Sequence, residues 1–142
     1  MTAEFTVAVH ALVFLYHKGT AFNSEAIATN VCTNPARIRK VLAKLKAAKL
    51  VETKGGAEGG YTFAGDGSMT LADVYSAVGA HAAKTEWRSG NPCLDCPIAS
   101  GMAPLMDTIF NELDDACRAT LQRTTIAALE AQLCKKGASH EV

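Results

Sequence analysis

The thiols of Cys93 and Cys96 are the side chains whose types and spacing most directly suggest chemistry in this sequence. Two cysteines three positions apart can form a disulfide or bind a metal ion, and a helix N-terminus or a nearby cation lowers the pKa of such thiols. The pair lies between Pro92 and Pro97, and Asp95 between the thiols opposes thiolate formation. A thiol–disulfide switch needs only these two residues, so we rank it first among the functional interpretations of the pair.

Three other interpretations of the pair stay open. Zn²⁺ needs about four ligands, so Cys117, His81 or a second copy of the chain would have to complete a zinc site. A disulfide oxidoreductase places its Cys-x-x-Cys after a strand, but no strand pattern precedes Cys93. The pair could also be inert, with another effector controlling the protein. The remaining cysteines, Cys32, Cys117 and Cys134, lie in apolar or helical contexts and are expected to be small buried residues.

A second group of side chains has the chemistry of nucleic-acid binding. Residues 33–54 contain seven Lys or Arg and one acid, Glu52, for a local charge of +6, whereas the whole chain has fourteen basic and fourteen acidic residues. Such a patch draws a polyanion to one face, where cations meet phosphates or guanine edges. A solvated surface is the alternative explanation. The candidate DNA-binding residues are Thr33, Asn34, Arg37, Arg39, Lys40, Lys44, Lys54 and Tyr61.

Half of these residues belong to a helix that we expect over residues 35–48. Asn34 is a suitable N-cap, and Pro35 suits the first helical position because its missing N–H has no partner there. The basic and small side chains lie opposite an apolar face, and Arg39 and Lys40 in the first half of the helix are candidates for base contacts. The apolar face repeats at helical spacing through Ile38, Val41, Leu42 and Leu45.

The segments on either side of this helix predict a winged helix-turn-helix. A short helix capped by Asn23 or Ser24 and ending near Val31 precedes it, separated by a three-residue turn. After it, residues 50–53 and 61–63 have strand composition, and two glycine pairs between them predict a tight reversal. This hairpin follows the helix directly, as a wing does, and Lys54 at its base is the candidate for a phosphate contact.

The remaining segments predict one small domain and an arm. A first helix over residues 4–16 and a short helix capped by Thr70 complete a DNA-binding domain over residues 1–80. Residues 81–103 show no clear periodicity and form a cysteine-containing loop. A long amphipathic helix from about Leu105 to Arg123 and a shorter last helix occupy residues 104–142. The apolar stripe of the long helix must be buried against another surface. A homodimer is the simplest way to bury it in a protein that binds two-fold symmetric DNA. We therefore expect a mainly α fold with a small β-hairpin wing and a long dimerisation helix.

Length and composition restrict the class of protein. A chain of 142 residues forms one domain, or one domain with an oligomerisation arm. The apolar run at residues 7–16 is too short to cross a membrane, and the N-terminus lacks the pattern of a secretory signal. We expect a cytoplasmic protein without a membrane partner. No Ser/His/Asp arrangement, paired carboxylate site or Walker loop is evident, so the sequence predicts a regulator and not an enzyme.

In combination, these motifs resemble the Rrf-two (Rrf2) family of bacterial winged-helix transcriptional regulators. The resemblance implies homodimers, one long dimerisation helix per subunit, and palindromic operators in double-stranded DNA that are bound by helix and wing. We expect such a regulator to act as a repressor. The motifs that carry the resemblance are the opening helix with Phe5 to Leu12, the basic helix leading into Lys49-Leu50-Val51, the wing from Gly55 to Tyr61, the segment Thr70-Leu71-Ala72-Asp73-Val74, and Thr124-Thr125-Ile126.

The resemblance also brings an iron–sulfur cofactor into consideration. Some family members ligate a cluster through three cysteines in this loop with wider spacing, whereas this chain has only the two thiols and no third before Cys117. A cluster or a zinc ion at Cys93, Cys96 and Cys117 is therefore an alternative to the thiol switch, and we assign no cofactor from the sequence. The family commonly has glycine at the position of Lys49 and a basic residue near Glu58, so the end of the basic helix and the wing tip are expected to differ here.

Overall fold

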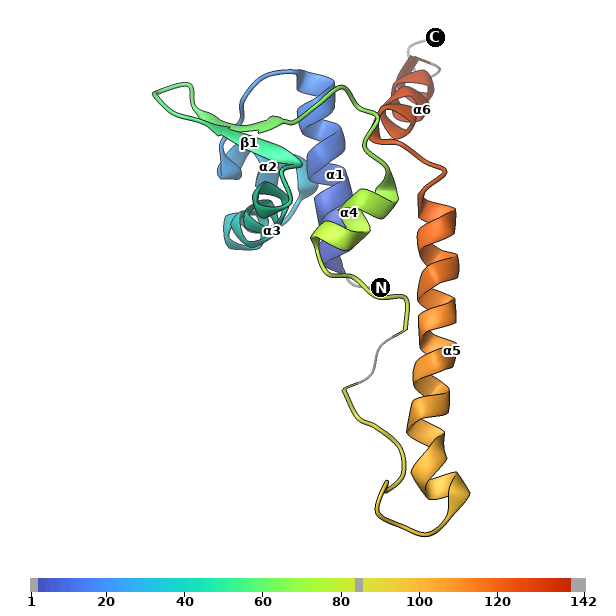
Figure 1. The fold of residues 1–142 in the computed structure, drawn as a ribbon. Coiled ribbons are helices and arrows are strands. Elements are labelled where there is room, and N and C mark those ends of the chain that lie inside the picture. Colours follow the sequence, from blue (N-terminus) through green and yellow to red (C-terminus); the bar gives the residue numbers. More distant parts are fainter. Residues whose placement is uncertain (1–2, 84–85, 139–142) are drawn as a thin grey trace.

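A computed structural model of the chain describes residues 3–83 and 86–138. Figure 1 shows a head built from the first part of the chain, an arm that extends away from it, and a last helix that returns to the head. Among the described residues, no helix is long and apolar enough to cross a membrane. In chain order the elements are α1 (Ala3–Lys18), α2 (Ser24–Val31), α3 (Pro35–Ala47), β1 (Val51–Lys54), β2 (Gly60–Phe63), α4 (Leu71–Ala77), α5 (Pro97–Leu121) and α6 (Ile126–Ala138).

The helix-turn-helix forms as the capping residues predict. The side chain of Asn23 accepts a hydrogen bond from the Ala26 N–H at 2.8 Å and begins α2, and Asn34 accepts from the Arg37 N–H at 2.8 Å and begins α3. Each of these caps satisfies a backbone donor that has no partner within its helix. Between the two helices Cys32 adopts φ of 64°, the left-handed conformation that ends α2 and turns the chain toward α3.

The hairpin forms the predicted wing directly after α3. Strands β1 and β2 pair antiparallel, with Val51 opposite Phe63 and Lys54 opposite Gly60. Lys49 has φ of 63°, so it takes the left-handed conformation for which glycine is suited, at a steric cost of roughly 1–2 kcal/mol. A lysine therefore occupies the left-handed position that follows α3, and the expectation that this helix end differs from that of other family members stays a prediction.

A segment before α2 extends the wing. The backbone of Phe22 exchanges two hydrogen bonds with Tyr61, at 3.1 and 2.8 Å, and this fixes the wing against the start of the helix-turn-helix. A Cβ at Gly60 would lie 2.3 Å from the carbonyl oxygen of Phe22, so the close approach requires glycine. The Phe22–Tyr61 bridge therefore holds the wing against the head, in addition to the covalent connection between the wing and α3.

One hydrophobic core joins α1, α2, α3, β1, α4 and the start of α6. Phe5 and Tyr75 meet edge to face in this core, with ring centroids 5.8 Å apart. The apolar face predicted for α3 is confirmed, since its four members are fully buried. The largest fully buried side chains are Tyr75, Leu12, Leu15, Ile27, Ile38, Leu42, Leu45, Ile126, Val41, Val51 and Val74.

Helix α5 is the arm, and none of its residues, all of which the structure describes, is buried. It begins at Pro97, earlier than the expected start at residue 104, so residues 97–103 are helical and not part of a loop. Pro97 occupies the first turn, where proline is tolerated, while the internal Pro104 obscured this part of the helix in the sequence. Leu105, Ile109 and Leu113 form an exposed apolar stripe along the arm.

Candidate nucleic-acid interface

The exposed face of α3 carries four of the eight predicted DNA-binding side chains. Its apolar face is buried in the core, which leaves Arg37, Arg39 and Lys40 exposed and Lys44 half-buried on the remaining surface. Asn34 caps the helix and Pro35 occupies its first turn, so the exposed cations Arg37, Arg39 and Lys40 all lie in the first half of α3. This arrangement suits insertion of the N-terminal half of α3 into a major groove.

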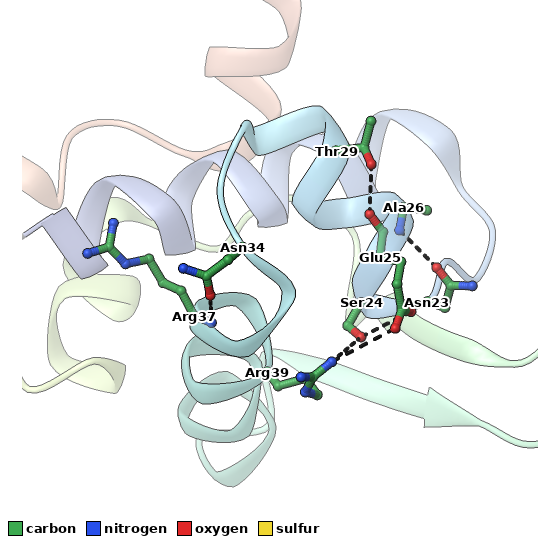
Figure 2. A network of polar contacts seen from close by, with 8 residues as sticks. All are labelled: Asn23, Ser24, Glu25, Ala26, Thr29, Asn34, Arg37 and Arg39. Atoms are coloured by element: carbon green, nitrogen blue, oxygen red, sulfur yellow. Dashed lines mark hydrogen bonds and ion pairs between the residues drawn. The ribbon is translucent and has the colours of Figure 1, made fainter.

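Arg39 is held against the start of α2. Its Nη1 lies 3.4 Å from the hydroxyl oxygen of Ser24 and 3.9 Å from a carboxylate oxygen of Glu25, as Figure 2 shows. Both sides of the ion pair are more than half exposed, so the pair contributes little to stability. To contact a base or phosphate, the Arg39 side chain must leave or share these partners.

Lys40 and Lys44 both contact Glu4 at the start of α1. The Nζ of Lys44 donates to one carboxylate oxygen at 2.7 Å, and the Nζ of Lys40 lies 3.2 Å from the other. The hydrogen bond from Lys44, together with that from Lys40, holds the pKa of the Glu4 carboxyl below its ordinary value, against the opposing effect of burial. Glu4 therefore neutralises part of the positive face of α3, a feature that the sequence analysis did not find.

Arg37 differs from the other cations of α3. Its backbone N–H donates to Asn34, its side chain has no hydrogen-bond or ion-pair partner among the described residues, and Figure 2 shows its guanidinium pointing away from the Arg39 cluster. A guanidinium without a protein partner can make bidentate contacts to phosphate or guanine with no internal bond to break. Arg37 is thus at least as good a candidate for base contact as Arg39 and Lys40.

The other predicted DNA-binding residues lie around α3. Lys54 ends β1 opposite Gly60 and is exposed beside the turn of the hairpin, so its predicted place at the base of the wing is wrong, while Thr33 is half-buried in the turn before α3. Asn34 is exposed, but its side-chain oxygen is used in capping, which leaves the amide N–H groups for other partners. Tyr61 is half-buried against the core, so its wing position depends on packing as well as on the bridge to Phe22.

The cysteine pair lies on the turn that begins the arm. Cys93 and Cys96 are both exposed and free, and Cys96 occupies the N-cap position of α5. The backbone N–H groups of Ala99 and Ile98 donate toward the sulfur and lower the pKa of the Cys96 thiol. The helix N-terminus is thus the factor that the sequence analysis required for an activated thiol.

The turn containing the pair is held against α5 by backbone contacts. The side chain of Asn91 accepts from the Cys93 N–H at 2.9 Å, and the Asn91 N–H donates to the carbonyl of Ala99 at 2.9 Å. Arg88, the nearest cation in the sequence, pairs with Asp107 at 2.5 Å. The thiols are therefore presented on an ordered turn, and the helix N-terminus lowers the pKa of Cys96 without a contribution from Arg88.

The structure separates Cys117 from the pair. Cys96 and Cys117 begin and nearly end the same helix, and twenty-one residues at 1.5 Å each place them about 30 Å apart. His81, which precedes α5 in the chain, lies beside Asp114, and Asp114 is in the half of α5 that is distant from the pair. One chain therefore supplies two thiols at this turn, which does not fit the four-ligand set of zinc or a cluster.

The predicted burial of the other cysteines is correct only in part. Cys117 is half-buried and packs against the core, but Cys32 and Cys134 are exposed. Cys32 ends α2 in a left-handed conformation that turns it away from the helix face, and Cys134 lies two turns beyond the buried start of α6. An apolar sequence context did not distinguish helix ends from helix faces.

A polar cluster that the sequence analysis also missed joins the head to the arm. Asp114 of α5 accepts hydrogen bonds from the Tyr75 hydroxyl at 2.5 Å, from the Ala82 N–H at 3.2 Å and from Arg118 at 3.0 Å. Arg118 also contacts Ser76 and lies over the Tyr75 ring, 5.0 Å from its centroid. This cluster connects the helix that follows the wing to the arm.

Comparison with known proteins agrees with this architecture. Residues 1–132 match the model of the Rrf2 family, which is described as "Iron-dependent Transcriptional regulator". A Bacillus subtilis protein, YwnA, whose name assigns it to the HTH-type transcriptional regulators, is 27% identical over 116 residues, which cover 82% of this chain and 86% of that protein.

Two solved structures show the same fold. One is the crystal structure of a protein from Lactobacillus plantarum described as a transcriptional regulator, with a TM-score of 0.80 and 28% identity, covering 99% of this chain and 97% of that one. The other is CymR, described as the global cysteine regulator of B. subtilis, with a TM-score of 0.67 and 17% identity, covering 93% and 96% of the two chains.

Proposed function

The chain belongs to the Rrf2 family of transcriptional regulators, and we propose that it binds a palindromic operator as a homodimer and represses transcription in response to thiol oxidation. The family and the relatives are regulators and not enzymes. The proposal includes a cytoplasmic location, where bacterial DNA is transcribed. Each of its three parts, DNA binding by α3, dimerisation by α5 and sensing by Cys93 and Cys96, is supported by a separate feature of the structure.

DNA binding rests above all on one observation, the basic exposed face of a capped helix whose opposite face is buried. We propose that Arg37 and Lys40 of α3 contact bases, and that Arg39 contacts a base once it leaves Glu25. Lys44 and Lys54 contact phosphates on either side of the groove. Thr33, Asn34 and Tyr61 add polar contacts to the sugar-phosphate backbone of the DNA. Such contacts position a protein on the duplex without specifying its sequence.

Dimerisation is supported by the exposed stripe of α5. Leu105, Ile109 and Leu113 follow one another at one-turn spacing on a helix that has no buried residue among its fully described positions. An exposed apolar stripe of this length requires a partner surface. A second α5 provides an identical stripe, and a two-fold axis would present two copies of α3 to two half-sites.

Sensing is supported by the activated thiol at the start of the arm. Cys96 has a lowered pKa and Cys93 lies three residues away on the same exposed turn. Oxidation of both thiols by hydrogen peroxide would form one S–S bond, and the two electrons and two protons that leave the thiols would convert the peroxide into two water molecules. Because one chain offers only two of the ligands that a cluster requires, we favour the disulfide over the iron-dependent chemistry in the family's description.

Selection of bound sequences from random duplex DNA tests the proposal. The recovered sites should be palindromic, and the affinity of the purified protein for them should fall steeply with salt. Alanine at Arg37, Arg39, Lys40, Lys44 or Lys54 should reduce the log–log salt slope by about one unit for each phosphate that the variant no longer neutralises. A variant that no longer reads a base should relax specificity at one position at a cost of about 1–3 kcal/mol.

Lys18→Ala is the matched control for this series. It removes one positive charge at the end of α1, where the lysine lies over the Phe14 ring and outside α3. Its salt slope and operator preference should equal those of the parent protein. Full operator affinity in an Arg37→Ala, Arg39→Ala, Lys40→Ala variant would refute the assignment of α3 as the recognition helix.

A further inference from the structure

Three potential metal ligands from distant parts of the chain meet where α6 packs on the end of α1. His17 lies in the last turn of α1, and Glu130 and Cys134 are one turn apart on α6. The Nδ1 of His17 lies 2.9 Å from the Oε1 of Glu130, and the Sγ of Cys134 lies 3.1 Å from the same oxygen. The sulfur and the imidazole nitrogen are 3.6 Å apart, so all three donor atoms converge on one point.

The donor types and their separations match one class of cation. Imidazole nitrogen, thiolate sulfur and carboxylate oxygen are the three ligand types that proteins use for Zn²⁺. Bonds of about 2.0–2.3 Å in a tetrahedron separate neighbouring donor atoms by roughly 3.3–3.7 Å. The sulfur–nitrogen pair already has this separation, and the other two pairs need to open by only a few tenths of an ångström. The hard cations Mg²⁺ and Ca²⁺ prefer all-oxygen sites and fit this set poorly.

The backbone holds the two helices in this arrangement without a metal. The N–H of Ile126 donates to the Met69 carbonyl at 2.9 Å, and that of Ala127 donates to Gly67 at 3.2 Å. A Cβ at Gly67 would lie 2.7 Å from the ring of Tyr16 in α1 and 3.0 Å from the Cβ of Ala127 in α6, so both helices pack closely against this one segment. Ile126 is fully buried in the core. The start of α6 is therefore fixed, and the i, i+4 spacing of Glu130 and Cys134 presents both ligands to His17.

We propose that His17, Glu130 and Cys134 bind one Zn²⁺ ion per chain, with water as the fourth ligand, and that the ion fastens α6 to α1. On binding, the thiol of Cys134 gives its proton to solvent and the sulfur becomes the metal ligand, with no change of oxidation state. The site is separate from Cys93 and Cys96, which lie on the turn at the far end of α5. It links the last helix directly to the first helix of the DNA-binding head.

The test uses Co²⁺ as a spectroscopic substitute for Zn²⁺ in the reduced full-length chain. A Cys93→Ser, Cys96→Ser background removes the other exposed pair, and metal-free protein is titrated anaerobically. One equivalent of Co²⁺ should give the thiolate-to-cobalt charge-transfer absorption and the visible bands of a tetrahedral site, and Zn²⁺ should displace it. Zn²⁺ should also raise the thermal midpoint of the protein at fixed protein concentration.

Three single variants identify the ligands. Cys134→Ala should abolish the charge-transfer absorption. His17→Gln and Glu130→Gln should each weaken metal affinity by at least about 100-fold, which is the upper end of the loss caused by mutating residues that only hydrogen-bond to metal ligands. All three ligands lie on the surface or half-buried, so the metal-free variants should unfold near the parent midpoint. Cys32→Ser, which removes an exposed thiol at the end of α2, should leave the titration unchanged.

Two results would overturn the proposal. The first is a cobalt spectrum that persists in the Cys134→Ala protein, which would place the thiolate ligand elsewhere. The second is a parent protein without the charge-transfer absorption at excess Co²⁺ and without a zinc-dependent thermal shift, which would show that the three side chains form only a hydrogen-bonded cluster.

Discussion

Asp114 in the arm accepts a 2.5 Å hydrogen bond from the hydroxyl of Tyr75 in the core of the head. That hydrogen bond, followed by those from Arg118 and the Ala82 N–H, lowers the pKa of the Asp114 carboxyl to about 2, from an ordinary value of 3.8. Burial raises the pKa of the Tyr75 hydroxyl, as does the adjacent carboxylate, so the phenol stays protonated and donates at neutral pH. The connection between head and arm therefore depends on a charged carboxylate.

The first prediction is a loss of stability in acid. A carboxyl with a lowered pKa in the folded state stabilises that state above pH 3.8, and the stabilisation is lost as the pH falls toward 2. The difference corresponds to a free energy of unfolding on the order of 2 kcal/mol. Urea unfolding at fixed protein concentration should show this loss in the parent and not in Asp114→Asn. Asp115→Asn, which changes the exposed neighbouring acid, should retain the parent's pH dependence, and an identical loss in both variants would contradict the assignment.

The second prediction concerns the oligomeric state. Replacing Ile109 and Leu113 by lysine puts two charges into the exposed stripe of α5 and should convert dimers into monomers, because like charges would face each other across a two-fold axis. Sedimentation velocity measures the change directly. Asp115→Lys adds a lysine to the same helix two residues beyond Leu113 and outside the stripe, so it should stay dimeric. An unchanged dimer in the double variant would place the interface elsewhere.

The third prediction concerns the acid that pairs with the lysines of α3. DNA must displace Glu4 from Lys40 and Lys44 before Lys40 contacts a base and Lys44 contacts a phosphate. Glu4→Gln should therefore raise operator affinity about two- to fivefold, the factor that corresponds to an exposed ion pair of roughly 0.5–1 kcal/mol. Fluorescence anisotropy with labelled operator at several salt concentrations measures the effect. Glu112→Gln on the arm is the control for loss of one negative charge, and a fall in affinity for Glu4→Gln would exclude both lysines from the interface.

Local signals in the sequence predicted the fold, whereas contacts between distant residues required the structure. The caps at Asn23 and Asn34, the apolar face of α3 and the glycine-rich wing are short-range patterns, and the structure confirms all of them. Glu4 and Lys44 are forty positions apart, and Tyr75 and Asp114 thirty-nine. Such pairs meet only through helix packing, for which a single sequence has no periodic signal. The activation of Cys96 was missed for a related reason, since it depends on α5 beginning at Pro97.

The fourth prediction compares two exposed thiols. The N–H groups at the start of α5 lower the pKa of Cys96, whereas the hydrogen bond to Glu130 raises that of Cys134. Because the thiolate is the nucleophile, iodoacetamide at neutral pH and in the presence of a chelator should modify Cys96 faster than Cys134. Peptide mass spectrometry over a pH series follows both sites. Glu130→Gln should accelerate Cys134 alone, and urea should remove the difference. Equal rates in the folded protein would contradict the proposed activation.

The last prediction concerns the switch itself. A disulfide between Cys93 and Cys96 would shorten and stiffen the turn that begins the arm, and α5 is connected to the head through Asp114 and Tyr75. A small rotation of the arms would change the separation of the two copies of α3, and half-site spacing is a geometric requirement. A coupling free energy of about 1.4 kcal/mol is already a tenfold change in affinity, so we expect the oxidised dimer to bind operator at least tenfold more weakly than the reduced dimer. Anisotropy titrations of both forms, with a Cys93→Ser, Cys96→Ser variant as the control that should not respond, measure this coupling. An equal response of parent and variant would remove the pair from the mechanism and direct attention to Cys32, an exposed thiol in the turn before α3.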